Sequence, residues 1–594
     1  MVLDRLDGLK RTDYCGTLTR ANEGKQVTVC GWVQRQRDLG GLIFVDLRDR
    51  SGILQLAFDD NTDRAVFEKA SSLRSEYVVM ASGKVRIRSS INTEIPTGEI
   101  EIEVDTLKIL GRSETPPFEI LENSNANEEL RLRHRYLDLR RPDIQKNILL
   151  RHKITKVTRD YFDENGFIEI ETPTLIKSTP EGARDYLVPS RVHKGSFFAL
   201  PQSPQLYKQL LMLSGFDRYM QIARCYRDED LRADRQPEFT QIDLEMSFVE
   251  PEDVYAIAEG YIKRLFKEVL DVDIPTPLPR LTFTEAMNDY GSDKPDTRFD
   301  MKIKDLSDIV ENCGFGVFAD TVKNGGTVRA ITAKNAAGVY TRKEIDKLTE
   351  VAKGIGAKGL AFIRWSEDAP TCSFAKFMTE EEMVAIYERT GAEKGDVVLI
   401  VADRKKVALS VLGALRLTVA KRLEIIPDKF NFLWITEFPF FEFNEDTGNW
   451  DAMHHPFTSP LDNCIEYLDN APEKVFAKAY DLVLNGIELS SGSIRITDPD
   501  LQKRMFKALG LTDEEAHEKF GFLTDAFKYG APPHGGMGIG LDRLVMLMCG
   551  CDSLRDVIAF PKVSNSSELM SGAPAEVDTA QLNELSIGIL NTEN

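Results

Sequence analysis

Cysteine is scarce in this chain, with 8 in 594 residues, and Cys549 and Cys551 are the only close pair. Because no CxxC motif occurs, neither a disulfide framework nor a zinc site is expected. Apolar runs of transmembrane length are also missing, and residues 1–7 lack the basic region and apolar stretch of a signal peptide. We therefore expect a cytoplasmic protein with no membrane partner.

Basic residues are outnumbered by acidic ones, because the chain has 75 Lys and Arg and 95 Asp and Glu, which gives a net charge of -20. Such a balance counts against a nucleic-acid partner, since phosphate binding relies on Lys and Arg. The arginines nevertheless gather in two short segments: Arg35, Arg37, Arg48 and Arg50 in the first, and Arg131, Arg133, Arg135, Arg140 and Arg141 in the second. Solvated surface charge or a phosphate contact would explain each patch taken alone.

A length of 594 residues with 42% hydrophobic content predicts several globular domains. The first of them is expected to contain five short strands, at residues 26–33, 42–47, 53–58, 77–87 and 99–110. Five strands in so short a span predict a small closed barrel, foremost an OB-fold, which commonly binds single-stranded nucleic acid. A purely structural barrel is the alternative.

A domain boundary is expected after the barrel, because residues 115–127 combine prolines with polar residues and offer little to bury. A helix from Asp143 to Glu164 should follow, stopped by Asn165 and Gly166, and then a strand over residues 167–171. Pro173 cannot donate to a sheet ladder, so it must lie at a strand end or edge, where a partner subunit could pack.

Two distant segments carry most of the functional information: Arg-Asp-Glu-Asp at 227–230 and Gly-Gly-Met-Gly-Ile-Gly-Leu-Asp-Arg at 535–543. Alone, the first is typical of a solvated hairpin tip and the second of a packing turn before a helix. Together, in this order and after a small β-rich module, they resemble motifs 2 and 3 of the class II aminoacyl-tRNA synthetases. The helix, strand and proline over 143–173 resemble motif 1, which builds the dimer interface in this family, so a homodimer is implied.

Other segments narrow the resemblance to the bacterial aspartyl-tRNA synthetases, namely residues 178–186, 202–208 and 453–457. Residues 300–424 resemble the α+β domain that those enzymes insert between motifs 2 and 3. The resemblance implies a multidomain α+β protein with an N-terminal OB-fold barrel and an antiparallel-sheet catalytic domain. The implied parts are an anticodon-binding domain at 1–112, a linker or hinge at 113–142, the catalytic domain at 143–299 and 425–594, and the inserted domain at 300–424.

The implied reaction joins L-aspartate and ATP as aspartyl-adenylate and then transfers the aspartyl group to tRNA(Asp). Activation brings a carboxylate to the α-phosphate of ATP, so cations must be held in place beforehand. By resemblance, Arg227 holds the α-phosphate and the substrate carboxylate, and Arg543 holds the γ-phosphate. Further ATP contacts are implied for Asp228, Glu229, Gln236, Glu488, Gly540, Leu541 and Asp542. Asp481 and Glu488 have the hard oxygen ligands that suit Mg²⁺.

An aspartate substrate needs fixed positive charge for its side chain and acceptors for its ammonium. Lys208, Arg495 and His454 could supply the charge. The acceptors and remaining contacts are expected among Glu181, Ser203, Gln205, Asp243 and His455.

Strand periodicity supports one of these assignments, because Gln241, Asp243 and Glu245 alternate with apolar residues and share one face. That face is either a site wall or exposed to solvent. The adjacent histidines His454 and His455 have no third zinc ligand at a recognised spacing, so a zinc site is not expected there. A hydrogen-bonding role at the substrate carboxylate is therefore expected for the pair.

The resemblance places the anticodon contacts in the barrel, at Arg37, Leu39, Phe44 and Gln55. Single-stranded loops are recognised by base stacking and edge hydrogen bonds, which Phe44 and Gln55 could supply. A core position is the alternative for Phe44. Relaxed enzymes, which also charge tRNA(Asn), often carry His where this chain has Leu39, so we expect a strict enzyme, with the relaxed kind as the alternative.

Competing functions are an asparaginyl- or lysyl-tRNA synthetase and an RNA-binding protein that has lost catalysis. The insertion and the segments around Glu181, Lys208 and His454 argue against the first. An inactive protein would usually have lost motif arginines or metal carboxylates, and the chain keeps Arg227, Asp481, Glu488 and Arg543. One departure is Ser490-Ser491, where many relatives carry glycines, and it could narrow the pocket floor.

Overall fold

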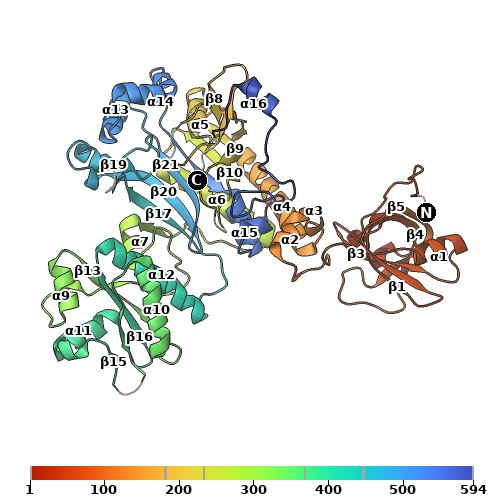
Figure 1. Cartoon of the computed structure of the whole chain (residues 1–594), viewed down its shortest axis with the longest axis horizontal. Coiled ribbons are helices and arrows are strands. Elements are labelled where there is room, and N and C mark those ends of the chain that lie inside the picture. Colours follow the sequence, from red (N-terminus) through yellow and green to blue (C-terminus); the bar gives the residue numbers. More distant parts are fainter. Residues whose placement is uncertain (1–2, 180–182, 232–233, 367–368, 445–447, 591–594) are drawn as a thin grey trace. The chain divides into compact units, whose positions relative to one another are not determined.

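The computed structural model describes residues 3–179, 183–231, 234–366, 369–444 and 448–590 (Figure 1). Its contacts divide the chain into two compact units. The barrel unit comprises residues 1–152 and 553–576, and the sheet unit comprises residues 153–552 and 577–594.

The barrel unit contains a closed five-stranded barrel in the order β1-β2-β3-β5-β4. Its strands are β1 (Gln26–Asp38), β2 (Ile43–Asp49), β3 (Gly52–Phe58), β4 (Val78–Ile87) and β5 (Ile100–Gly111). The single parallel pair in this barrel is β3 with β5. The predicted closed barrel is confirmed, although β1 continues to Asp38 rather than ending at residue 33. Helix α1 (Arg64–Ser71) and the 3-10 turns η1 (Cys15–Thr17) and η2 (Arg20–Asn22) were not predicted.

The barrel unit continues through α2 (Glu128–Arg133), α3 (Arg135–Asp138) and the first part of α4 (Pro142–Glu164), and includes the turn η6 (Leu554–Asp556). Helix α4 starts one residue before the predicted position. It ends at Glu164, and Gly166 follows with a φ of 78°, a left-handed conformation that glycine adopts without strain.

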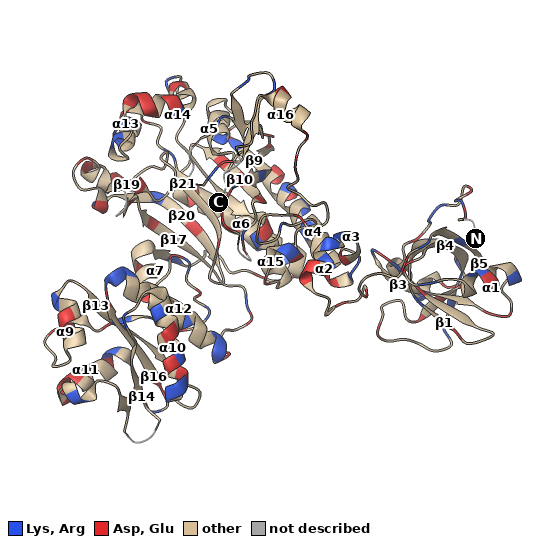
Figure 2. Ribbon diagram, in the orientation of Figure 1, with Lys and Arg blue, Asp and Glu red and all other residues tan. Residues whose placement is uncertain are grey.

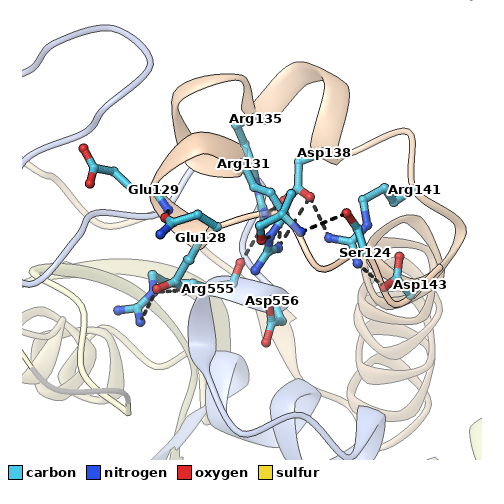
Figure 3. A network of polar contacts seen from close by, with 12 residues as sticks. Ser124, Glu128, Glu129, Arg131, Arg135, Asp138, Arg141, Asp143, Arg555 and Asp556 are labelled. Atoms are coloured by element: carbon cyan, nitrogen blue, oxygen red, sulfur yellow. Dashed lines mark hydrogen bonds and ion pairs between the residues drawn. The ribbon is translucent and has the colours of Figure 1, made fainter. Parts of the chain in front are cut away.

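A buried ion-pair network organises this part of the barrel unit. Figure 3 shows Arg131, Arg135 and Arg141 converging on Asp138, which is fully buried. Arg135 also donates to three backbone carbonyls between residues 555 and 559. Buried charges are stable only when paired, so Arg135 and Arg141 are structural. Neither surface charge nor a phosphate contact explains these two arginines, which corrects the reading of the second arginine patch.

The sheet unit is built on an eight-stranded sheet in the order β11-β17-β20-β21-β22-β10-β9-β6. Its strands are β6 (Ile168–Glu169), β9 (Arg218–Tyr226), β10 (Glu238–Ser247), β11 (Arg280–Thr282), β17 (Phe432–Pro439), β20 (Phe476–Leu484), β21 (Ile487–Ile494) and β22 (His534–Gly540). The pairs are antiparallel except at the two edges, β11 with β17 and β6 with β9.

Helices and two small hairpins accompany this sheet. The helices are α5 (Gln205–Leu213), α6 (Pro251–Leu270), α7 (Phe283–Tyr290), α13 (Pro499–Ala508), α14 (Asp513–Phe527), α15 (Leu541–Cys549) and α16 (Thr579–Leu585), with 3-10 turns η4 (Asp462–Tyr467) and η5 (Pro472–Lys474). The hairpins pair β7 (Leu187–Pro189) with β8 (Phe197–Ala199), and β18 (Phe441–Asn444) with β19 (Asn449–Ala452).

The strand predicted over residues 167–171 is shorter than expected. Only Ile168 and Glu169 form β6, and one further backbone bond follows, from Ile170 N to Met220 O at 3.2 Å. The prediction of a strand over all of residues 167–171 is therefore wrong, and Pro173, which has no N–H to donate, lies beyond the end of the ladder.

A second sheet lies between Lys304 and Asp403, in the order β12-β13-β16-β14-β15 and with antiparallel pairs throughout. Its strands are β12 (Lys304–Asp305), β13 (Thr327–Ala333), β14 (Ala361–Arg364), β15 (Thr371–Cys372) and β16 (Val397–Asp403). The accompanying helices are α8 (Ser307–Val310), α9 (Gly316–Lys323), α10 (Arg342–Ile355), α11 (Glu380–Thr390) and α12 (Lys405–Arg422), with the 3-10 turn η3 (Ala375–Phe377). This segment has its own apolar clusters and is α+β, as predicted.

Charged side chains of both signs are spread along the ribbons of both units, and single helices such as α10 and α11 carry both (Figure 2). The net negative charge is therefore not gathered in one segment. No helix among the described residues is long and apolar enough to cross a membrane.

Candidate active site

The floor of the candidate site is a row of glycines in β22. Gly536, Gly538 and Gly540 alternate along this strand, so they face the same side of the sheet. A Cβ at Gly536 would lie 2.3 Å from Glu245 Oε2, and a Cβ at Gly538 would lie 3.3 Å from Gln241 Oε1. The atom nearest to a Cβ at Gly536 is Leu244 O, at 2.1 Å, so glycine here lets β22 lie close to the polar groups of β10 without displacing them.

A buried network of four charged side chains borders the floor. Lys208 Nζ, from α5, lies 2.7 Å from Asp243 Oδ1 and 3.5 Å from Glu245 Oε2. Arg495, which follows β21, donates from Nε and Nη2 to the two oxygens of Glu245, at 2.8 and 2.9 Å. All four residues are at most 4% exposed. Asp243 and Glu245 on the polar face of β10 are therefore buried, which excludes the solvent-exposed alternative for these two residues.

Electrostatics favour the charged forms of Glu245 and Arg495. Burial by itself would raise the pKa of Glu245, but Arg495 and Lys208 hold that pKa below its ordinary value. The pKa of Arg495 is raised, because Glu245 outweighs the effect of burial. An ammonium has three N–H donors, and Lys208 directs two of them at Asp243 and Glu245. A guanidinium has five, and Arg495 directs two at Glu245 and two at His455 and Ser493, so one donor of each cation is left for a ligand.

The two adjacent histidines are neutral. His455 Nε2 lies 2.6 Å from Arg495 Nη1, and because a guanidinium only donates, Nε2 accepts and the ring proton lies on Nδ1. Burial, and then the charge of Arg495, lower the pKa of His455 well below its ordinary value and lower that of His454 to about 4. The expectation that His454 supplies positive charge is wrong for this reason. A hydrogen-bonding role is compatible with a neutral ring.

Four buried polar atoms around this network lack a hydrogen-bond partner among the described residues. They are Gln205 Nε2, Asp243 Oδ2, His454 Nε2 and His455 Nδ1. Buried polar atoms are nearly always partnered, so the gathering of these four makes this place a candidate for a polar ligand. Asp243 Oδ2 can accept a bond, and the Gln205 amide and His455 Nδ1–H can donate one, which suits a ligand with both positive and negative groups.

Arg227 lies directly after β9, where the chain turns toward β10. Its guanidinium carbon is 5.1 Å from the centre of the Phe239 ring, and its buried Nε has no partner among the described residues. The ring therefore supports one face of the guanidinium and leaves the donor edge for an anion.

The neighbours of Arg227 are engaged with one another or with the backbone. Asp228 N donates to Arg184 O at 3.0 Å, and Glu229 Oε2 accepts from Arg235 Nη1 at 3.0 Å. Gln236 is buried. The structure brings these predicted ATP residues together in one hairpin.

Arg543 lies in the first turn of α15, which starts directly after Gly540. Its Nη1 donates to Glu488 O at 2.9 Å, and its Nη2 lies 3.4 Å from Asp234 Oδ2. Two other predicted ATP residues, Leu541 and Asp542, are buried, and Asp542 Oδ2 accepts from the backbone N–H of Thr240 at 2.7 Å. Their side chains hold the helix in place, so an ATP contact would have to come from their backbone.

Asp481 and Glu488 form the predicted metal pair on the hairpin of β20 and β21. Burial, and then the charge of Glu488, raise the pKa of Asp481 well above its ordinary value, and Asp481 Oδ1 has no partner among the described residues. A divalent cation would relieve both effects, and Mg²⁺ is commonly held by one or two carboxylates together with phosphate oxygens. The pair therefore fits Mg²⁺. In the described part of the chain, no group of three His, Cys, Asp or Glu side chains is arranged around a metal position.

The remaining predicted substrate residues lie at the start of α5 or outside the described residues. Ser203 Oγ accepts from the backbone N–H of Gln205 at 3.3 Å. Glu181 lies outside the described residues. Ser490, where many relatives carry glycine, is 2% exposed. Its Oγ is a further buried atom with no hydrogen-bond partner among the described residues.

Three of the four predicted anticodon residues lie together on the outside of the barrel. Arg37 Nη2 donates to Gln55 Oε1 at 3.0 Å, and the guanidinium carbon is 5.8 Å from the centre of the Phe44 ring. Phe44 is half-buried and lies between the core residues Ile43 and Val45, so the core alternative is excluded. Leu39 is 69% exposed in the turn between β1 and β2.

The sequence analysis did not identify some residues that contact the candidate site. Glu245 was placed on the correct strand face, but its double bond to Arg495 spans 250 residues, and no local pattern predicts it. Ser493, whose Oγ lies 2.5 Å from Arg495 Nη1, was also missed. So was Lys294, 3.7 Å from Glu488. The alternating glycines at 536, 538 and 540 were the one available signal for the close approach of β22 to the polar groups of β10.

Comparison with known proteins identifies the fold and its relatives. Residues 127–564 match the family model of class II tRNA synthetases (D, K and N), and residues 27–110 match that of the OB-fold nucleic acid binding domain, which confirms the OB-fold prediction. The crystal structure of asparaginyl-tRNA synthetase from Pyrococcus horikoshii, complexed with asparaginyl-adenylate, has a TM-score of 0.58, with 19% identity and coverage of 93% of this chain and 98% of that chain. At this identity the similarity shows the fold alone.

Other proteins are much more similar to this chain in sequence. A protein of Ruminiclostridium cellulolyticum named aspartate–tRNA ligase is 60% identical over 590 residues, which covers 99% of each chain. A protein of Caldanaerobacter subterraneus subsp. tengcongensis named aspartate–tRNA(Asp/Asn) ligase is 58% identical over 589 residues, with the same coverage. With the family match over residues 127–564, these similarities show that the chain belongs to the class II tRNA synthetases of the aspartate, lysine and asparagine group.

Proposed function

We propose that the protein joins L-aspartate to tRNA(Asp) in two steps. A carboxylate oxygen of aspartate attacks the α-phosphorus of ATP, which forms aspartyl-adenylate and releases pyrophosphate. A ribose hydroxyl of the terminal adenosine of the tRNA then attacks the aspartyl carbonyl carbon, and AMP leaves. The observation that carries the proposal is the buried set Lys208, Asp243, Glu245 and Arg495, with unpartnered polar atoms gathered around it.

The cations of this set are suited to the side-chain carboxylate of aspartate. Lys208 and Arg495 both contact Glu245, so their remaining N–H groups lie near each other. Asp243 Oδ2 and Gln205 are suited to the ammonium and the α-carboxylate of the same molecule, and His455 Nδ1–H supplies a further donor. Asparagine, with no side-chain charge, would leave the buried cations with a weaker partner.

Arg227 and Arg543 are the proposed catalytic residues. Arg227, supported by Phe239, would bind the α-phosphate and the attacking carboxylate and stabilise the charge that develops between them. Arg543 would bind the γ-phosphate. The remaining ATP contacts are proposed for Asp228, Glu229, Gln236, Glu488 and the backbone of residues 540–542.

Asp481 and Glu488 would hold Mg²⁺. When bound there, the ion would neutralise charge on the phosphate oxygens. The protein's part is to present two carboxylates, one of them buried, with an oxygen that has no other partner among the described residues.

The barrel is the proposed anticodon reader. The half-buried ring of Phe44 offers a surface on which a base can stack, and Arg37 and Gln55 can bond to base edges or phosphate. Gln55 Nε2 already donates to Glu101 Oε2 at 2.6 Å, so reading a base would require it to exchange this bond.

We propose the strict kind of enzyme because of Leu39. The second candidate, a relaxed enzyme that also charges tRNA(Asn), is favoured by the name of the relative that is 58% identical, aspartate–tRNA(Asp/Asn) ligase. The two tRNAs differ at one anticodon base, so few contacts can separate them.

Three further assignments complete the proposal. A homodimer would pack on the motif 1 region, where Ile168 and Leu175 are 48% and 50% exposed. The location would be the cytoplasm, where charged tRNA is used. The domain bounds are those expected from the sequence, with residues 300–424 as the inserted domain.

Pyrophosphate exchange into ATP, measured across a panel of amino acids, tests the proposed function. Exchange should depend on aspartate, and purified tRNA(Asp) should then be charged. A protein that binds tRNA but shows no amino-acid-dependent exchange would support the inactive RNA-binding alternative instead.

A further inference from the structure

A cavity in the barrel unit carries an unusual number of arginines. Its volume is about 290 Å³, and Arg11, Arg48, Arg50 and Arg140 line it together with the rings of Tyr14 and Trp32. The strand register places it away from the proposed anticodon residues. Trp32 pairs with Arg48 in the ladder of β1 and β2, whereas Arg37 pairs with Phe44 at the far end of that ladder.

The carboxylates near the cavity do not balance these cations. Arg48, 5% exposed, donates from Nη2 to both oxygens of Glu76, and Arg140 donates to one of the same oxygens at 3.0 Å. The other acidic group, Asp49, lines the cavity but accepts from the backbone N–H of Cys15 at 2.8 Å. Arg48 Nη1 is buried and has no partner among the described residues. Four guanidinium groups thus face two carboxylates.

The aromatic rings of the cavity are already covered. The guanidinium carbons of Arg11 and Arg50 lie 4.7 and 4.8 Å from the centre of the Tyr14 ring, and that of Arg140 lies 4.9 Å from the Trp32 ring. The rings therefore fix the planes of the guanidinium groups, and a base that stacked on a covered face would have to displace a guanidinium. Arg11 Nη2 donates to Cys30 O at 2.9 Å and Arg50 Nη2 donates to the Tyr14 hydroxyl at 3.1 Å, so each of these two groups keeps further N–H donors. Guanidinium groups stacked and held in this way suit an anion with several oxygens, such as a phosphate.

We propose that this cavity binds a backbone phosphate of the tRNA, in the paired stem that adjoins the loop at Phe44. The proposal rests on the proposed function, because it takes the RNA as the partner of the barrel. Trp32 and Arg37 are separated by about 17 Å along β1 at about 3.3 Å per residue. An RNA that reaches both must extend beyond its loop. The cavity would also give a chain of net charge -20 a local positive site for a polyanion.

The test uses the full-length protein with Arg50→Gln and, separately, Arg11→Gln. Both arginines are exposed at the cavity, whereas Arg48 could unfold the barrel if changed. Binding of an RNA hairpin with the anticodon stem and loop is measured over a range of salt concentrations, beside a single-stranded RNA with the loop sequence only. Each variant should weaken hairpin binding several-fold at low salt and lower the salt slope by about one, because one phosphate contact is lost. Binding of the single strand should not change.

The control is Arg64→Gln, an exposed arginine on α1 whose side chain is 81% accessible and which pairs with Glu68. It should leave both RNAs unaffected, and thermal denaturation checks that each variant is folded. An unchanged hairpin slope in folded Arg50→Gln and Arg11→Gln would overturn the proposal. So would stabilisation of the wild type by inorganic phosphate, lost in the variants without any effect on hairpin binding, because the ligand would then be a free anion. Aspartate-dependent pyrophosphate exchange by the wild type needs no tRNA, so it tests the proposed function separately.

Discussion

The pocket around Arg495 and the outer face of the barrel around Arg37 use the same residue types, but they differ in how much water reaches them. The side chain of Arg495 is 2% exposed and is held by two bonds to Glu245. The side chain of Arg37 is 37% exposed and shares its donors between Asp46 and Gln55. Arg495 is held in one position away from water, whereas Arg37 is the partly exposed member of a polar network in which Gln55 is 3% exposed.

This difference sets what each surface can do. In a desolvated pocket, a missing charge partner is costly, so the pocket can select one amino acid strongly. On an exposed surface, charge interactions are screened and base stacking contributes modest, sequence-tolerant energy. We therefore expect large effects of substitution in the pocket and smaller, salt-dependent effects on the barrel.

The largest effect should come from the buried cations. Arg495→Leu and Lys208→Met should each impair aspartate activation by about 2–5 kcal/mol, because a buried carboxylate loses its charged partner. Aspartate KM and kcat in pyrophosphate exchange measure the change. The control is Arg504→Leu. Arg504 lies on α13, its side chain is 37% exposed, and it pairs with Asp469, so its loss should have little effect on aspartate activation. Near-wild-type kinetics in both pocket variants would contradict the pocket assignment.

A smaller effect is expected on the barrel. Phe44→Ala should weaken binding of the anticodon stem-loop by roughly 1–3 kcal/mol if a base stacks on the ring. Ile91→Ala, which shortens another exposed apolar side chain of the same unit, is the control. If folded Phe44→Ala binds the stem-loop as the wild type does, no base stacks on Phe44, and RNA binding by the barrel must depend on other residues.

The pocket histidines predict a pH effect on stability. The folded pKa of His454 is about 4, below its unfolded value, so the unfolded chain takes up a proton first as the pH falls. Stability should therefore be lost as the pH falls below the unfolded pKa and toward about 4. His454→Asn should lessen this loss by about 1–2 kcal/mol at pH 5. Thermal denaturation at pH 7.5 and pH 5 measures it, and an equal loss in wild type and variant would show that His454 is not buried as described.

The smallest effect concerns the choice of tRNA. Leu39→His should narrow the difference in kcat/KM between tRNA(Asp) and tRNA(Asn) by roughly 1 kcal/mol, because one exposed contact changes. Charging of both purified tRNAs with aspartate measures it. If the wild type already charges both with similar kcat/KM, the relaxed alternative holds and Leu39 does not confer strictness.

The two regions also differed in how far the sequence predicted them. Alternation gave all five barrel strands, because apolar core residues such as Val27 and Val29 alternate with outward-facing ones. The same alternation placed Asp243 and Glu245 on one face. It could not show that this face is buried, because burial depends on Lys208 and Arg495, which other parts of the chain supply. Burial also explains why the charge expected on His454 is absent.

Short elements and special contacts escaped prediction for similar reasons. The strand β6 has two residues, too few for a period to show, and α1 was hidden between two strong strand patterns. For the second arginine patch the sequence left surface charge and a phosphate contact open, and it gave no sign that Asp138 is buried among these arginines. The candidate site residues were predicted from the resemblance to the synthetase family, and their hydrogen-bond and ion-pair partners were found only in the structure.

The central claim is that Lys208 and Arg495 select a side-chain carboxylate, and pyrophosphate exchange with aspartate and with asparagine tests it most directly. These substrates have nearly the same shape and differ in charge. The account predicts that kcat/KM for aspartate exceeds that for asparagine by about 10³-fold or more, as expected of a site whose buried polar groups would lose a charged partner. Similar kcat/KM values for the two amino acids, or a preference for asparagine, would contradict it.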